Sequence, residues 1–256
     1  MEFIEVSENN GFTILALNRP DKRNAMHAPM IMECRQALSS IATTSSRVLI
    51  IHGNGENFCA GGDIAWMQKI AAGSADENYN DAQQLADLLF EIYQFPKPVI
   101  VLAHGATLGG GLGLLAAADI AIAAADAKFG LPEVKIGLTP SMISPYVISA
   151  IGERMAHFYF LTGERFGAQE AKRLGLIHQV TETESLMNTG LMIANLLLEN
   201  SPQALRSAKQ LIRTVSQQKI TKDLAGLTAE HLAELRQTKE AQEGLLAFIE
   251  KRKPKW

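Results

Sequence analysis

The sequence is poor in cysteine and has no excess of basic charge. Only two of its 256 residues are cysteine, Cys34 and Cys59, which is too few for a disulfide scaffold and gives no metal-ligand spacing. Its 24 Lys and Arg residues stand against 27 Asp and Glu, for a net charge of −3. General binders of nucleic acid or anionic membranes normally carry a basic excess. We therefore expect reduced thiols and no nucleic-acid partner.

Motifs for several chemistries are missing as well. There is no GxxxxGK(S/T), HExxH, CxxC or GxSxG pattern, so phosphate-loop, zincin, thioredoxin and serine-hydrolase functions lack a motif. The six histidines show no ligand spacing, and we expect no metal and no redox cofactor. The N-terminal stretch carries Glu2, Glu5 and Glu8, the opposite of a basic signal or transit peptide, so we expect a cytoplasmic protein.

One uncharged segment, residues 98–118, could be mistaken for a membrane span. It even places Gly105, Gly109 and Gly113 at four-residue intervals, as membrane helix pairs do. However, it holds five glycines, and its first part is β-branched. We predict a strand, a glycine turn and a buried helix here, and no membrane association.

Short apolar segments alternate with segments of helical spacing up to about residue 140. This alternation predicts a β/α core, and the remainder of the chain is predicted to be almost entirely helical. The predicted strands cover 3–6, 12–17, 48–52, 99–103 and 120–123. The predicted helices cover 25–41, 64–71, 85–93, 111–118, 154–161, 168–174, 185–198 and 202–215. Residues 73–80 are small and polar, which indicates a mobile loop.

Two predicted strand-to-helix junctions, 57–64 and 109–113, are rich in small residues. Glycine lets a ligand approach the backbone, and a helix N-terminus presents unpaired N–H groups. Two such junctions can direct two N–H groups at one oxygen, which is the geometry of an oxyanion hole for a thioester enolate. The second junction is also compatible with close packing alone or with a GxGxxA dinucleotide turn. The dinucleotide turn is disfavoured because the candidate acid, Glu133, lies beyond the next strand instead of ending it.

Glu133 is the acid best placed for chemistry. It lies in an apolar context with Leu131, Pro132 and Val134, and burial there would raise its pKa toward the range useful for proton transfer. An acid after proline often does no more than cap a helix. The two glycine junctions favour a catalytic role.

The motifs taken together resemble those of the crotonase superfamily, also called the enoyl-CoA hydratase/isomerase family. The resemblance covers essentially the whole chain. It rests on LNRPDKRNAM (17–26), FCAGGDI (58–64), AHGATLGGGLGLLAAADIAIAAADAKFGLPEVKIGLTP (103–140), LTGERFGAQEAKRLGLI (161–177) and the C-terminal EGLLAFIEKRKPKW. It implies an α/β fold with a spiral core of ββα units over 1–195. It also implies a C-terminal helical trimerisation region over 196–256, in a homotrimer or a dimer of trimers.

The resemblance also implies roles for single residues. The N–H groups of Gly62 and Gly110 would form the oxyanion hole, and Glu133 would be the catalytic glutamate. CoA would enter only as part of an acyl-CoA thioester substrate. Its implied contacts are the backbone at Ala60, Gly61, Asp63 and Ile64, the phosphate-binding segment with Lys22, Arg23 and Ala25, and Phe248 and Lys251, which relatives often supply from a neighbouring subunit. For Phe248 and Lys251, packing and solvation remain the alternative.

The chain departs from the family's two-glutamate hydratases at Gly113, where those enzymes carry a second glutamate. Residues 141–146 also replace a glycine-rich stretch. The segments 62–67 and 141–154 are similar to bacterial methylglutaconyl-CoA hydratases, whose substrate carries a distal carboxylate. Lys135 and Arg154 are the nearest cations along the chain.

Three functions follow from these motifs. The first is an enoyl-CoA hydratase, a lyase using one glutamate, with 3-methylglutaconyl-CoA of leucine catabolism as a candidate substrate. The second is a Δ3,Δ2-enoyl-CoA isomerase, because one carboxylate suffices to move a proton between two carbons. The third is a non-catalytic acyl-CoA-binding protein.

Overall fold

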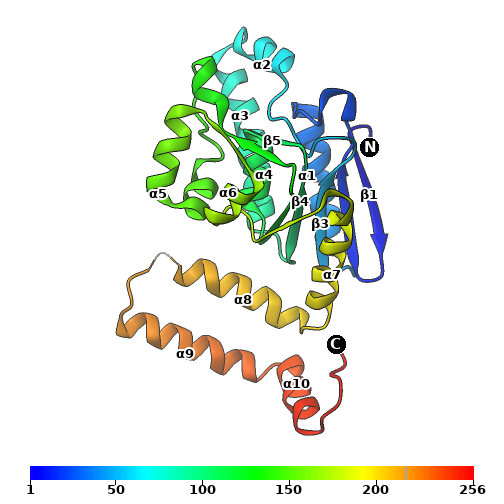
Figure 1. The fold of residues 1–256 in the computed structure, drawn as a ribbon. Coiled ribbons are helices and arrows are strands. Elements are labelled where there is room, and N and C mark those ends of the chain that lie inside the picture. The colour runs from blue at the N-terminus through cyan, green and yellow to red at the C-terminus, as the bar shows by residue number, and fades with distance from the viewer. Residues whose placement is uncertain (217) are drawn as a thin grey trace.

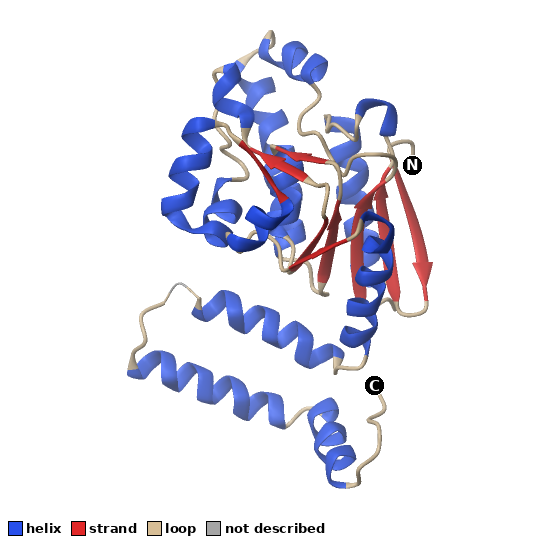
Figure 2. Ribbon diagram, in the orientation of Figure 1, coloured by secondary structure: helices blue, strands red, loops and turns tan. Residues whose placement is uncertain are grey.

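A six-stranded sheet is the centre of the computed structural model, which describes residues 1–216 and 218–256 (Figures 1 and 2). Its strand order is β1-β2-β3-β4-β6-β9. The strands are β1 (Ile4–Asn9), β2 (Phe12–Leu17), β3 (Val48–Gly53), β4 (Val99–Ala103), β6 (Ile120–Ala124) and β9 (Gln179–Thr181). β1 and β2 form the predicted antiparallel hairpin, and every later pairing in this sheet is parallel.

Helices cover both faces of the sheet, which is why β3 and β4 are almost continuously apolar. Leu49, Ile51 and Val101 face one core, shared with α1 (Ala28–Thr43), α3 (Ala75–Tyr93) and α4 (Gly110–Ala117). Alternate residues of the same strands face a second core with α7 (Leu186–Leu198). The remaining helices of this part are η1 (Pro20–Lys22), α2 (Ile64–Ala71), η2 (Pro132–Ile136), α5 (Ser144–Thr162), α6 (Ala168–Arg173) and η3 (Thr183–Ser185).

A second, three-stranded sheet joins β5 (Ala106–Leu108), β7 (Lys128–Gly130) and β8 (Arg165–Gly167). Its strands have only three residues each, and the sequence pattern did not predict them. The parallel β5–β7 pair is extended by a bond of 3.0 Å from the N–H of Gly109 to the carbonyl of Gly130. This small sheet therefore places the chain entering η2 beside the chain entering α4.

Most predicted helices are confirmed, including α2 and α8 (Pro202–Val215) at the predicted bounds. Residues 98–118 contain the predicted strand (β4) and the predicted helix (α4), and between them lies the short strand β5, which was not predicted. No helix in the described part of the chain is both long and apolar enough to span a bilayer. The prediction of a mobile loop at 73–80 is wrong. Ser74 and Glu77 form a capping box that starts α3 at Ala75, so these polar residues begin a helix.

The C-terminal helices α8, α9 (Lys222–Arg236) and α10 (Lys239–Ile249) stand apart from the sheet and its covering helices (Figure 1). We call residues 1–198 the lobe and α8, α9 and α10 the arm. The predicted boundary at 195/196 falls inside α7, whose residues pack on the sheet. The division into a core over 1–195 and an oligomerisation region over 196–256 stays a prediction. Trimerisation through the arm stays a prediction.

Candidate active site

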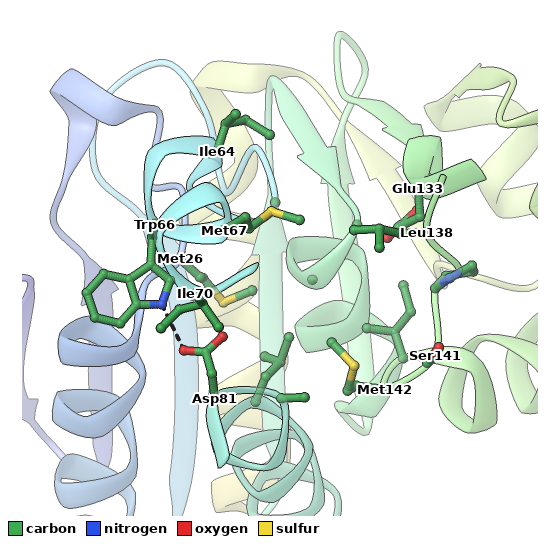
Figure 3. Close-up of a pocket in the computed structure, with 18 of the residues that line it drawn as sticks. Met26, Ile64, Trp66, Met67, Ile70, Asp81, Glu133, Leu138, Ser141 and Met142 are labelled. Atoms are coloured by element: carbon green, nitrogen blue, oxygen red, sulfur yellow. Dashed lines mark hydrogen bonds between the residues drawn. The ribbon is translucent and has the colours of Figure 1, made fainter. Parts of the chain in front are cut away.

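A cavity of about 340 Å³ opens between α2 and α3 on one side and residues 132–143 on the other (Figure 3). Its volume lies at the small end of ligand sites, which suits an acyl group better than a whole CoA. Six of the predicted site residues line it. They are Ala60, Gly61, Gly62, Ile64, Gly110 and Glu133.

The N–H of Gly62 is free because of how its segment pairs. Met26 donates from its N–H to the carbonyl of Gly61 at 2.7 Å, and its carbonyl accepts from the N–H of Asp63 at 2.8 Å. Gly62 lies between Gly61 and Asp63, and in a parallel bridge of this kind its own N–H points away from Met26. Within the described chain the Gly62 N–H has no acceptor.

Gly110 is the first residue of α4, so its N–H has no acceptor within the helix, and the carbonyl of Ala106, four residues back, accepts from the N–H of Cys59 instead. Gly109 precedes it with φ of +48°, a conformation that favours glycine. A Cβ at Gly109 would lie 2.9 Å from Oε1 of Glu133. The glycine run therefore has two local causes, a left-handed turn and the close approach of a carboxylate. Neither requires a dinucleotide.

Glu133 reaches the cavity from η2, behind the buried Leu131. Burial raises the pKa of its carboxyl group above the usual 4.5. Its Oε2 is buried without a hydrogen-bond partner in the described chain, while Oε1 faces Gly109. An unpaired acid with a raised pKa beside a helix N-terminus has the properties of a proton-transfer group.

The position of the family's second glutamate is filled by another side chain. A Cβ on Gly113 would lie 2.3 Å from Cγ2 of Ile143, and Ile143 is 2% exposed. Ile143 belongs to the segment 141–146 that departs from the family pattern. The two departures are therefore one structural feature: the isoleucine occupies the space next to the glycine. On the side of the cavity formed by residues 132–143, Glu133 supplies the carboxylate, and Leu138 lies beside it (Figure 3).

Asp63 has a structural role that the sequence did not indicate. Its side chain accepts from the N–H groups of Ala65 and Trp66 at the start of α2, and its other oxygen pairs with Arg19 at 2.6 Å. Arg19 also donates to the carbonyl of Ala25. These bonds fasten the Gly62 segment to the chain before α1.

The predicted CoA contacts do not all line this cavity. Lys22 and Arg23 are exposed, but the carbonyl of Arg23 accepts from the N–H of Ala60 at 3.0 Å, so they lie beside the oxyanion segment. Phe248 lies on α10 of the arm and is 84% exposed, and Lys251 follows the end of that helix. Neither residue lines the cavity.

Sequence reasoning missed the side chains that shape the cavity. Trp66 donates from Nε1 to Asp81 at 2.8 Å across the α2–α3 side (Figure 3). Met67 is the side chain nearest to a Cβ position on Gly62, and Met26 is the one nearest to a Cβ position on Gly110. The segments that contain these residues, 17–26 and 62–67, were singled out only for their resemblance to the family, and no pattern showed that these side chains line a cavity. The further lining residues missed include His27, Ile70, Asn78, Leu85, Leu138, Thr139, Ser141 and Met142.

A buried carboxylate opposite two free glycine amides, on a fold of this kind, is typical of enzymes that stabilise an oxyanion. A family model described as enoyl-CoA hydratase/isomerase matches residues 7–256. The chain belongs to this enzyme family.

Relatives with hydratase names match the whole chain. The 2,3-dehydroadipyl-CoA hydratase of Escherichia coli is 32% identical, covering 99% of this chain and 98% of that protein. The crotonyl-CoA hydratase of Syntrophomonas wolfei is 33% identical, covering 98% and 96%. A crystal structure of an enoyl-CoA hydratase from Shewanella pealeana superposes with a TM-score of 0.96 at 41% identity, covering 99% of this chain and 96% of that one. The predicted crotonase fold is thus confirmed.

Proposed function

We propose that the protein is an enoyl-CoA hydratase that adds water to an α,β-unsaturated acyl-CoA thioester with a single glutamate. The observation that carries the proposal is the unpaired, buried carboxyl group of Glu133 in the cavity that Gly62 and Gly110 also line. The hydratase names of full-length relatives support the same reaction.

In this mechanism the thioester carbonyl accepts hydrogen bonds from the N–H groups of Gly62 and Gly110. Glu133 takes a proton from water as the oxygen adds to Cβ, and the enolate charge develops on the carbonyl oxygen. A proton then reaches Cα and restores the thioester. One oxyanion donor stabilises such a transition state by about 3–4 kcal/mol.

The CoA part of the substrate would lie along Ala60–Ile64, with its phosphates near Lys22, Arg23 and Ala25. The side chains of Lys22 and Arg23 are exposed, and the backbone of Arg23 is hydrogen-bonded to Ala60 at the start of this segment, which supports the placement. Phe248 and Lys251 would complete the CoA site from a second copy of the chain in a trimer. Their distance from the cavity of their own chain agrees with that arrangement.

A Δ3,Δ2-enoyl-CoA isomerase is the second candidate, and Ile143 is the observation that favours it. The isoleucine replaces a polar group beside Glu133 with an apolar one. One carboxylate can move a proton between two carbons without adding water.

Mass spectrometry of CoA thioesters, with ultraviolet absorbance to detect a double bond conjugated to the thioester, separates the candidates. Crotonyl-CoA and a 3-enoyl-CoA are incubated with wild type and with Glu133→Gln, which keeps the shape and removes the base. A gain of one water that Glu133→Gln abolishes supports the hydratase. A shifted double bond without a mass change supports the isomerase.

A matched control is Glu182→Gln, which changes an exposed glutamate outside the cavity and is expected to leave turnover unchanged. Retained hydration in Glu133→Gln would overturn the mechanism. Binding of CoA thioester without any turnover in wild type would favour a non-catalytic acyl-CoA-binding protein.

A further inference from the structure

The charged groups of the cavity all carry the same sign. Among the described lining residues, the ionisable side chains are His27, Asp81 and Glu133, and none is Lys or Arg. Lys135 and Arg154, the nearest cations along the chain, are exposed and do not line the cavity. Lys135 instead lies against Gly163, where a Cβ would meet its Cε at 3.0 Å.

His27 does not supply a cation either. Burial, together with the charge of Arg19, lowers the pKa of its imidazole from the usual 6.5, so the ring is neutral at neutral pH. It packs edge-on against Trp66 with ring centroids 6.0 Å apart. The cavity, as far as the chain is described, thus holds no cationic side chain to pair with an anion.

Asp81 lies across the cavity from Glu133, on the α2–α3 side (Figure 3). One of its oxygens accepts from Nε1 of Trp66 at 2.8 Å, which fixes the carboxylate against the wall. Its other oxygen has no hydrogen-bond donor in the described chain. An acyl chain that ends in a carboxylate would bring a second negative charge to this wall, and like charges at short range in a partly buried site repel strongly.

Apart from the uncharged polar side chains of Asn78, Thr139 and Ser141, the rest of the lining is apolar and adaptable. Three methionines, Met26, Met67 and Met142, project toward the cavity (Figure 3). Methionine side chains are flexible and polarisable, so they fit apolar groups of different shape. Aliphatic side chains complete the lining: Ile31, Ile64, Ile70, Leu85, Ile136, Leu138 and Ile143.

We propose that this cavity takes the neutral, apolar acyl chain of an enoyl-CoA, and that Asp81 selects against acyl chains ending in a carboxylate. This inference rests on the proposed hydratase function and names its substrate class. It differs from the prediction, made from the sequence, that 3-methylglutaconyl-CoA is the substrate. The described lining offers no cation for the distal carboxylate of that substrate.

The test uses pairs of substrates that differ only at the end of the acyl chain. Hex-2-enoyl-CoA is paired with 2,3-dehydroadipyl-CoA, and 3-methylpent-2-enoyl-CoA with 3-methylglutaconyl-CoA. We expect wild type to prefer the neutral member of each pair by roughly 10- to 100-fold in kcat/KM, the scale of one uncompensated like charge.

Asp81→Asn removes the charge and keeps an oxygen that can accept from Trp66. It is expected to shift the ratio of the two kcat/KM values, carboxylated member over neutral member, about tenfold toward the carboxylated member of each pair. Asp76→Asn is the matched control, because Asp76 lies in the first turn of the same helix, is exposed and does not line the cavity. It should not change the preference.

A wild-type preference for the carboxylated members would overturn the inference while leaving the hydratase function intact. An unchanged preference in Asp81→Asn, with neutral turnover retained, would overturn the role of Asp81. The absence of Glu133-dependent hydration with all four thioesters would instead overturn the proposed function itself.

Discussion

The lobe and the arm bury their apolar side chains in different ways. The lobe has two cores, with side chains such as Leu49, Ile100 and Phe129 fully enclosed. In the described part of the arm, α8 and α9 have no buried residue, and α10 has only Ala247. Large apolar arm residues are exposed: Ile212, Leu227, Leu232, Leu245, Leu246, Phe248 and Ile249.

The lobe therefore encloses two apolar cores within one chain, whereas the described helices of the arm bury almost no side chain. Burying apolar surface is the main driving force for folding, so an exposed apolar face lacks that contribution. The arm is held to the lobe by polar contacts, among them Lys209 with Asp119 at 2.5 Å and Arg213 over the ring of Tyr93 at 4.5 Å. The proposed chemistry lies in the lobe, and changes there should affect turnover without affecting assembly.

The largest effect is expected from Glu133→Gln in the lobe. Hydration should fall by about 10³-fold, since general-base catalysis typically contributes 10²–10⁴-fold. Because burial raises the pKa of Glu133, the ionised form destabilises the folded protein above the usual pKa, and glutamine removes that cost. The Tm at neutral pH should therefore not fall. Steady-state kinetics and thermal unfolding check both points, and a lower Tm with normal kcat would reverse the assignment.

Gly110→Ala should reduce turnover by about 10²-fold, the scale of one oxyanion donor. The added Cβ would lie 2.3 Å from Cε of Met26, the end of a flexible side chain that also lines the cavity, so Met26 must move and the cavity lining beside Gly110 changes. The fold should persist because the obstacle can shift. Circular dichroism checks the fold and kcat/KM the effect; full activity in this variant would remove Gly110 from the oxyanion hole.

The pH profile should show an acid limb above 4.5, the usual pKa of glutamate. Glu133 must be ionised to accept a proton, and burial raises its pKa, so kcat/KM is full above the raised pKa and falls about tenfold per pH unit below it. Rates measured from about pH 4 to pH 8 locate the limb. A limb below 4.5 would show that another group is the base.

Phe248→Ala tests whether the arm completes a CoA site in a second copy. The KM for a CoA thioester should rise by about tenfold with kcat nearly unchanged, because the phenylalanine is 84% exposed in its own chain and remote from the cavity. Lys253→Ala, an exposed change beyond α10, is the control. An unchanged KM would leave Phe248 without a part in CoA binding.

The smallest effect is expected from Gly226→Ala in α9, where a Cβ would meet nothing within 4 Å. Alanine should stabilise this helix by about 0.5–1 kcal/mol because it loses less backbone entropy than glycine. The same substitution therefore has opposite consequences in the two regions, inactivation at Gly110 and mild stabilisation at Gly226. Denaturant unfolding measures the change, and a loss of stability would show that the arm needs glycine there.

Local patterns predicted the elements whose formation depends on local causes. The apolar strand β4, the glycine-initiated helix α4 and the proline-initiated helix α8 all follow from their own residues. The prediction of a mobile loop at 73–80 was wrong because it was based on the small, polar composition and overlooked the capping box of Ser74 and Glu77. The strands β5, β7 and β8 could not be predicted, since three residues carry no periodicity and their pairing joins distant segments.

The sequence by itself determined the family, and it pointed to the two glycine junctions and to Glu133 as the candidate acid. These depend on residue type, because only glycine accepts the backbone at Gly109 and only an acid supplies the base. The tertiary structure decided what surrounds them. Ile143 against Gly113, and Asp81 held by Trp66, are contacts between residues distant in sequence. They are fixed by how the start of α5 packs on α4 and how α2 packs on α3. The character of the acyl cavity is a property of that packing, which no local pattern encodes.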